Sequence, residues 1–204
     1  LGGAPNFPTI NTAGTANSTI LGTINLGVNG ASNSFVLNAD QVVSLGAGSR
    51  LQIRGTDASL SMGVNDRIEL GANAQIDFSG TPGSLMMVAP IIDLQNGSIL
   101  MPETSSSVIL NGTQVALGDI DVATSLQVFG ALGSTIEVAG AISAAEVDFV
   151  IPGGGRVVGT QAGAEIFVQD TLQITGTEHI YGSGPQQSLS LRSGPTANIF
   201  LDIL

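Results

Sequence analysis

Histidine is the side chain most often used for proton transfer near neutral pH, and this chain contains only His179. Glu178 precedes it, and on a strand these two side chains would point to opposite faces. A Ser-His-acid triad would need a serine and an acid brought to His179 from other segments, and the spacing indicates neither. We therefore interpret His179 as a turn or surface residue.

Two aspartates stand one residue apart in the sequence DID, at Asp119 and Asp121. On a strand, both carboxylates would lie on the same outward face. Calcium takes six to eight oxygen ligands, so Glu146 or Asp148 from a later segment would have to join them. We interpret Asp119 and Asp121 as solvated surface carboxylates, with a Ca²⁺ site as the alternative, and we expect no other cofactor.

Further acids recur at related places in the chain, at Glu69, Asp77 and Asp93. Hydrolysis of a glycosidic bond needs two carboxyls roughly 5 to 10 Å apart across the sugar. These three acids stand singly among serine, glutamine and asparagine, and with no Trp and one Tyr the chain has few aromatics to wall a sugar groove. We expect no enzymatic activity.

The elements that would position these residues belong to a repeat with a period of 25. Residues 43–47 (VSLGA) return as residues 68–72 (IELGA), and residues 51–55 (LQIRG) return as residues 76–80 (IDFSG). Each run alternates apolar with polar or small residues, which is the pattern of a strand with one buried face. A fixed period of this length is the signature of a solenoid.

The repeat predicts an all-β, single-domain parallel β-helix of three-strand coils, each about 19–28 residues long. Stacked coils place Val43 over Ile68 and Ile68 over Ile92. A fourth coil is predicted to begin at residue 115, with residues 126–130 and 136–138 as its second and third strands. Glycines such as Gly118 follow the strand ends, where a corner favours a residue that tolerates positive φ.

The two ends of the chain differ from the repeat. Residues 1–19 are rich in small and polar types and predict an extended arm, followed by the solenoid at 20–204. Residues 197–204 predict an apolar terminal strand. Either this strand packs back along the solenoid, or the chain has been truncated, or the strand is covered by another subunit. For the second alternative, the residues predicted to mediate assembly are Phe7, Ile10, Ile199, Phe200, Leu201, Ile203 and Leu204.

Composition limits the partners and the location. Five Arg, no Lys and 16 acids give a net charge of −11, which disfavours nucleic-acid binding. No run reaches the roughly 18 apolar residues of a membrane helix. The absence of Cys, together with a start at Leu1 that suggests processing or a fragment, favours an extracellular or cell-surface protein of a prokaryote. The sequons at Asn17, Asn96 and Asn111 leave glycosylation open.

The IxLGA and LxIxG units of residues 20–180 resemble the β-helical repeats of autotransporter passengers and of filamentous-haemagglutinin-type adhesins. This resemblance implies a secreted, passive, elongated protein, and it carries no catalytic motif. At ~4.8 Å per coil, however, this chain would form a rod only about 40 Å long. We therefore predict a self-assembling structural subunit of a filament, sheath or surface layer. The alternatives are an adhesin domain that binds cell-surface glycans and a glycan-active β-helical enzyme.

Overall fold

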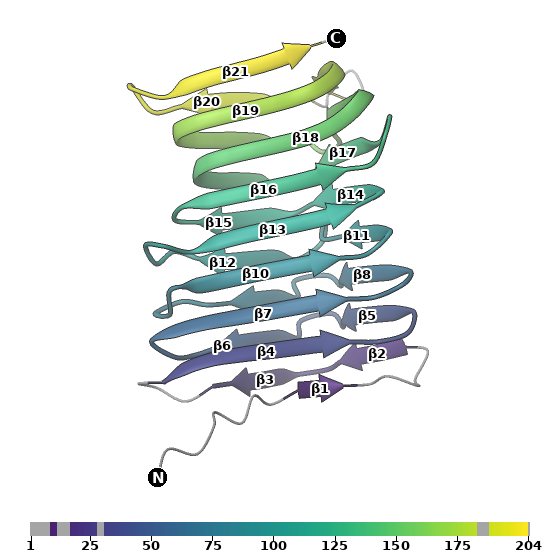
Figure 1. Cartoon of the computed structure of the whole chain (residues 1–204), viewed down its shortest axis with the longest axis vertical. Helices are drawn as coiled ribbons and strands as arrows, with labels where there is room; N and C mark the ends of the chain where they lie inside the picture. The colour runs from purple at the N-terminus through teal and green to yellow at the C-terminus, as the bar shows by residue number, and fades with distance from the viewer. Residues whose placement is uncertain (1–8, 12–16, 28–30, 183–187, 204) are drawn as a thin grey trace.

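Strands make up all the regular secondary structure in the residues that the computed structural model describes, which are 9–11, 17–27, 31–182 and 188–203. They wind into a single parallel β-solenoid of about seven turns (Figure 1). The predicted all-β parallel β-helix is therefore confirmed. The first and last strands lie at opposite ends of the stack (Figure 1).

Successive coils pair in register, so each coil adds one strand to each of three parallel sheets. Sheet 1 contains β1 (Thr9–Asn11), β4 (Ser32–Asn38), β7 (Asp57–Gly63), β10 (Gly83–Val88), β13 (Ser107–Gly112), β16 (Ser125–Gly130) and β21 (Asn198–Ile203). Sheet 2 contains β2 (Asn17–Ile20), β5 (Val42–Leu45), β8 (Arg67–Leu70), β11 (Ile91–Asp93), β14 (Gln114–Leu117) and β17 (Thr135–Val138). Sheet 3 contains β3 (Thr23–Leu26), β6 (Arg50–Ile53), β9 (Gln75–Asp77), β12 (Ser98–Met101), β15 (Asp119–Val122) and β20 (Ser190–Ser193). Two long strands, β18 (Ala141–Gly159) and β19 (Glu165–Gly182), each run through all three sheets.

The core is built from ladders of identical or similar apolar side chains. Val43 pairs with Ile68 and Ile68 with Ile92, as predicted, and all three are fully buried. Burying one such side chain contributes roughly 1.5–3 kcal/mol relative to leaving it exposed. Because alternate residues point inward, the residues between them form the outer surface of each sheet.

Coil length varies along the solenoid. Phe35 pairs with Leu60 and Leu60 with Leu85, which gives a period of 25 residues in this part of the chain. Val108, however, pairs with Leu126 only 18 residues later, slightly below the predicted range of 19–28. The strand pattern is kept while the corners shorten.

The predicted assignment of the fourth coil is wrong. Its second strand is β15, which pairs with β12, and residues 126–130 form the third strand, next to β13. Residues 136–138 already begin the following coil, because they pair with β14. A single residue, Gly118, separates β14 from β15, so a search at a period of 25 steps over this strand.

Two segments of the predicted amino-terminal arm are strands of the solenoid. Thr9 pairs with Val36 and Asn17 pairs with Val42, so β1 and β2 extend sheets 1 and 2. Residues 1–8 and 12–16 of that arm lie outside the described residues. At the other end, the apolar strand β21 pairs in register with β19, where Ile199 lies next to Leu172.

Candidate functional site

The structure does not assemble the predicted calcium ligands. Asp119 and Asp121 share the outer face of sheet 3, as predicted, and Asp119 Oδ1 accepts a hydrogen bond from the Ala141 amide at 2.9 Å. Glu146 and Asp148, in contrast, belong to the segment of β18 that pairs with β16 in sheet 1. The described residues contain no group of three or more His, Cys, Asp or Glu side chains able to hold a metal ion.

His179 lies in β19, where its backbone pairs with Arg156 of β18. The side chains of Glu178 and His179 lie outside what the structure describes. The interpretation of His179 as a surface or turn residue therefore stays a prediction, although its place is in a strand.

The three recurring acids are divided between two sheets. Glu69 and Asp93 are direct neighbours on the outer face of sheet 2, whereas Asp77 lies in sheet 3. Asp77 is only 1% exposed, although the alternation along its strand directs the side chain outward. Arg50 and Arg54 cover it, with guanidinium nitrogens 2.8 and 3.6 Å from Asp77 Oδ2.

In this cluster, the carboxylate of Asp77 forms ion pairs with both Arg50 and Arg54. We interpret the cluster as structural. Burial alone would raise the pKa of Asp77, but the hydrogen bonds from Ser79 and the two guanidinium charges outweigh burial and hold that pKa below its ordinary value. The Ser79 amide donates to Asp77 Oδ1 at 2.7 Å. Sequence reasoning missed the cluster, although the period of 25 places Asp77 beside Gln52, midway between the two arginines.

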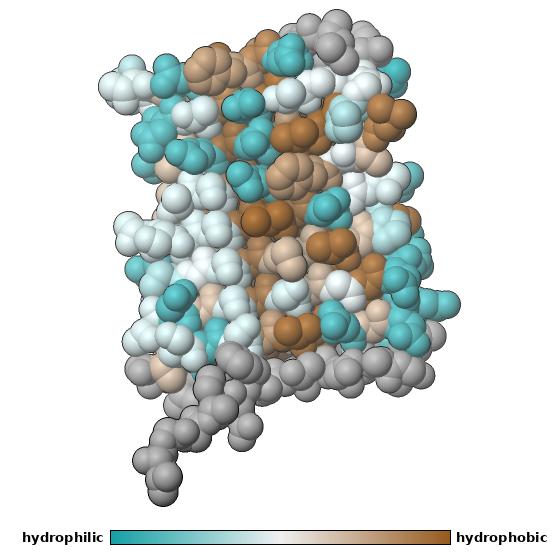
Figure 2. Space-filling model, viewed as in Figure 1, coloured by the Kyte–Doolittle hydropathy of each residue, from teal (hydrophilic) through white to brown (hydrophobic). Residues whose placement is uncertain are grey.

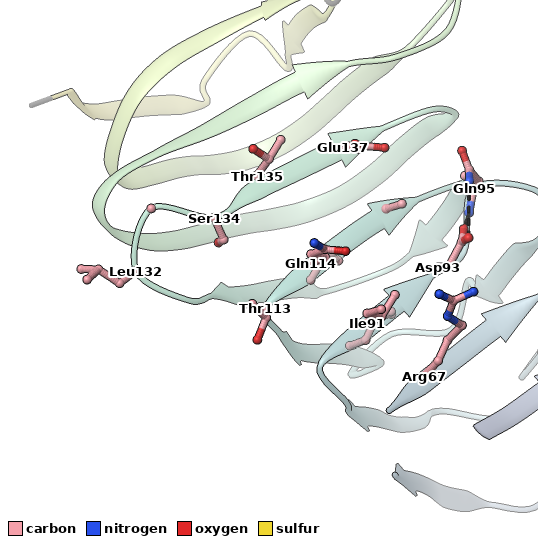
Figure 3. Close-up of a pocket in the computed structure, with 14 residues that line it drawn as sticks. Arg67, Ile91, Asp93, Gln95, Thr113, Gln114, Leu132, Ser134, Thr135 and Glu137 are labelled. Carbon is pink, nitrogen blue, oxygen red and sulfur yellow. Dashed lines mark hydrogen bonds between the residues drawn. The ribbon is translucent and has the colours of Figure 1, made fainter. Parts of the chain in front are cut away.

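A shallow groove of about 620 Å³ crosses the outer face of sheet 2 (Figure 3). Its floor is formed by β11, β14 and β17, and the turn between β16 and β17, which carries the exposed Leu132, forms one side. The polar side chains that line it include Arg67, Asp93, Gln95, Gln114, Thr135 and Glu137.

The register of the coils explains why these side chains line the same groove. Asp93 pairs with Ala116 and Ala116 pairs with Glu137, so the two carboxylates point outward from the same column, two coils apart. Gln114 occupies the neighbouring outward column on the middle coil. Because the residue between the carboxylates is alanine, the middle of the groove stays hollow.

The outer face of sheet 1 has a different character. One outward column consists of Ser34, Ser59, Ser84, Ser107 and Ser125, each paired with the next. Ser59 donates a hydrogen bond to Ser34 at 2.8 Å. A band of apolar residues runs along the middle of this face (Figure 2) and includes Val36, Met86, Val88, Ile109, Phe129 and Val150. Of these, Met86 and Val88 are 43% and 42% exposed.

Asp148 borders this apolar band. It pairs with Gln127 and Gln173 in the adjacent coils, and its Oδ1 atom is buried without a hydrogen-bond partner. Burial raises the pKa of Asp148 above its ordinary value. An unpaired carboxylate in this position lowers the stability of the fold when it is ionised.

The residues predicted to mediate assembly are only partly described. Ile199, Phe200 and Leu201 of β21 are exposed, Phe200 by 57%. The backbones of Ile10 and Ile203 pair with Leu37 and Thr177, but the side chains of both residues, and all of Phe7 and Leu204, lie outside the described residues.

No family model, curated protein or solved structure matches the chain. The described residues include no helix long and apolar enough to cross a membrane. Two surface features stand out among the described residues: the nearly uncharged central part of the outer face of sheet 1 and the polar groove on sheet 2.

Proposed function

We propose that the protein is a structural subunit of an extracellular filament, sheath or surface layer, and that copies associate through the outer face of sheet 1. The observation that carries this proposal is the near absence of charge in the central strands of that face. Asp57, at the start of β7, is the only charged residue in the five strands β4, β7, β10, β13 and β16. The proposed role is passive and includes no catalytic step.

Electrostatics favours this face over the others. The chain carries a net charge of −11, so two copies repel each other wherever acidic surfaces meet. Sheet 2 presents Glu69, Asp93 and Glu137, and sheet 3 presents Asp119 and Asp121. Because charged residues are depleted in the cores of protein interfaces, the neutral face of sheet 1 is the one on which close approach costs least.

The side chains on this face are suited to packing against a second sheet. Two sheets pack face to face about 10 Å apart, with their outward side chains interleaved. Met86, Ile109 and Phe129 would then be buried, and Met and aromatic side chains are enriched in interface cores. The serine column beside the apolar band supplies hydroxyls that both donate and accept hydrogen bonds.

The size of the face indicates that a single contact would be weak. Five strands ~4.8 Å apart, each about six residues long at ~3.3 Å per residue, cover an area of about 20 by 20 Å. Stable interfaces commonly bury about 800 Å² on each partner. An extended assembly would need a second contact as well, and the exposed apolar residues of β21 are the proposed candidate for a head-to-tail one.

The test compares two matched variants by sedimentation velocity over a concentration series, with electron microscopy of the native protein. Ile109→Glu places a charge on the outer face of sheet 1, and Ile91→Glu places the same charge on sheet 2 at a position of similar, intermediate exposure. We expect the native protein and Ile91→Glu to associate, and Ile109→Glu to remain monomeric at concentrations about tenfold higher. A monomeric native protein, or equal behaviour of both variants, would overturn the proposal.

A further inference from the structure

The groove on sheet 2 is a surface with repeating polar positions and no strand edge. Each coil adds one outward residue to each of two columns, and in the groove at least one of the two is polar, so polar groups recur about every 4.8 Å along the solenoid axis. The backbones of β11, β14 and β17 are already paired on both sides. A ligand in this groove must therefore be recognised by side chains and not by strand addition.

Several of these side chains have hydrogen-bonding capacity that the protein does not use. Within the described part of the chain, the exposed side chains of Gln114 and Glu137 make no hydrogen bond or ion pair. Asp93 receives only two long hydrogen bonds, of 3.4 Å each, from the amide and the side chain of Gln95. Carboxylates accept, and carboxamides both donate and accept, which is the combination that a hydroxyl-rich ligand can satisfy.

We infer that this groove binds a neutral, linear oligosaccharide lying along the solenoid axis. Hydroxyl groups spaced along such a chain would meet Asp93, Gln114 and Glu137 on three successive coils. The aliphatic side chain of Leu132, 79% exposed at the side of the groove, would cover an apolar face of a sugar ring. An anionic polysaccharide would be repelled by the two carboxylates, since Arg67 is turned to Glu69 at 3.7 Å.

The proposed role of the groove is binding without cleavage. Asp93 and Glu137 are two coils apart, so their backbones are separated by about 10 Å at ~4.8 Å per coil. Glu69 is nearer to Asp93, but it does not line the groove and is paired with Arg67. The site goes beyond the proposed assembly function, since it lies on a different sheet.

The experiment is isothermal titration calorimetry of the full chain with neutral hexasaccharides of β-linked glucose, xylose, mannose and N-acetylglucosamine, and with acidic hexagalacturonate. We expect at least one neutral hexasaccharide to bind and hexagalacturonate not to bind. Gln114→Ala should weaken that binding at least tenfold, whereas Gln127→Ala, the same change on the outer face of sheet 1, should leave it unchanged. Glu137→Gln should weaken it less than Gln114→Ala, because a carboxamide keeps a hydrogen-bond acceptor for the hydroxyls.

Four results would overturn the inference: no binding of any neutral hexasaccharide at millimolar concentration, binding of hexagalacturonate alone, equal effects of Gln114→Ala and Gln127→Ala, or release of shortened sugars. Thermal melts of each variant establish that the fold is kept. The two tests can be told apart with Ile109→Glu, which changes sheet 1 and leaves the groove residues in place, whereas Ile91→Glu changes a residue that lines the groove.

Discussion

At the scale of single residues, two aspartates have environments that shift their pKa values in opposite directions. Asp77 is enclosed by two guanidinium groups and accepts a hydrogen bond from the Ser79 amide, so its charged form is stabilised. Asp148 has a buried oxygen without a partner, so its charged form is destabilised. In the sequence, both residues have the pattern of ordinary outward-facing acids. The alternation of a strand predicts on which face a side chain lies, but it does not predict which other side chains cover that face.

Asp77→Asn should lower the free energy of unfolding by about 1–3 kcal/mol at pH 7, since the buried partner of Arg50 and Arg54 loses its charge. The folded-state pKa of Asp77 is lowered, so its contribution is present above the unfolded pKa and is lost as the pH falls through the folded value. Urea denaturation at pH 7 and in acid measures the difference between variant and native protein, which should shrink in acid. Glu69→Gln, which breaks the exposed pair with Arg67, is the control and should cost less than about 1 kcal/mol. Equal losses for the two variants would contradict this assignment.

Asp148→Asn should have the opposite effect and raise the free energy of unfolding at pH 7 by about 1 kcal/mol. Because burial raises the folded-state pKa of Asp148, the folded protein binds the proton more tightly than the unfolded chain, and stability falls as the pH rises through that window. The advantage of the variant should therefore disappear below the unfolded pKa, near pH 3. Asp121→Asn removes an exposed carboxylate of the same charge and serves as the control. A gain of equal size in both variants would point to net charge alone as the cause.

At the scale of elements, the length of the turns between strands determines how much of the solenoid can be predicted from the sequence. Strands of residues 41–110 follow the period of 25 closely, and their ladders of Val, Ile and Leu were predicted in register. The 18-residue coil that follows was not predicted correctly, because the corner between β14 and β15 consists of a single residue, Gly118. The groove depends on that coil: Glu137 aligns with Asp93 only once β15 is recognised as a strand, so sequence reasoning did not bring these two acids together.

Gly118 should be a corner that is sensitive to substitution, for a reason that the sequence did not indicate. Its φ is not positive, but a Cβ atom there would lie 2.2 Å from the Leu94 carbonyl oxygen and 2.4 Å from that of Gly97. Gly118→Ala should therefore lower the free energy of unfolding by about 1–3 kcal/mol, because two backbone segments must move apart. Chemical denaturation of this variant and of Gly63→Ala makes the comparison, since at Gly63 the nearest atom is the end of the Asn38 side chain at 3.3 Å. If Gly63→Ala were as costly, close backbone approach would not be the reason.

At the scale of the whole molecule, the distribution of charge bears on the proposed association between copies. The solenoid places its acids mainly on sheets 2 and 3, on the end of sheet 1 near Glu146 and Asp148, and in the last coils. The central part of sheet 1 is left neutral, with an apolar band beside a column of serines (Figure 2). A flat and uncharged face on a strongly acidic rod allows lateral contact there, while the groove on sheet 2 stays accessible to a ligand.

Association through a neutral face of an acidic molecule should strengthen as salt is added. The repulsion between two copies that each carry a net charge of −11 is screened over about 30 Å at 0.01 M salt but over only about 3 Å at 1 M. The packing of Met86, Ile109 and Phe129 against a second copy does not depend on ion pairs, so salt removes the repulsion and leaves the attraction. Sedimentation velocity at 0.01, 0.1 and 1 M NaCl should show association growing roughly tenfold or more across the series. Dissociation on adding salt would instead require attractive ion pairs across the contact, and these would have to come from sheets 2 and 3, because the central strands of sheet 1 contain no charged residue except Asp57.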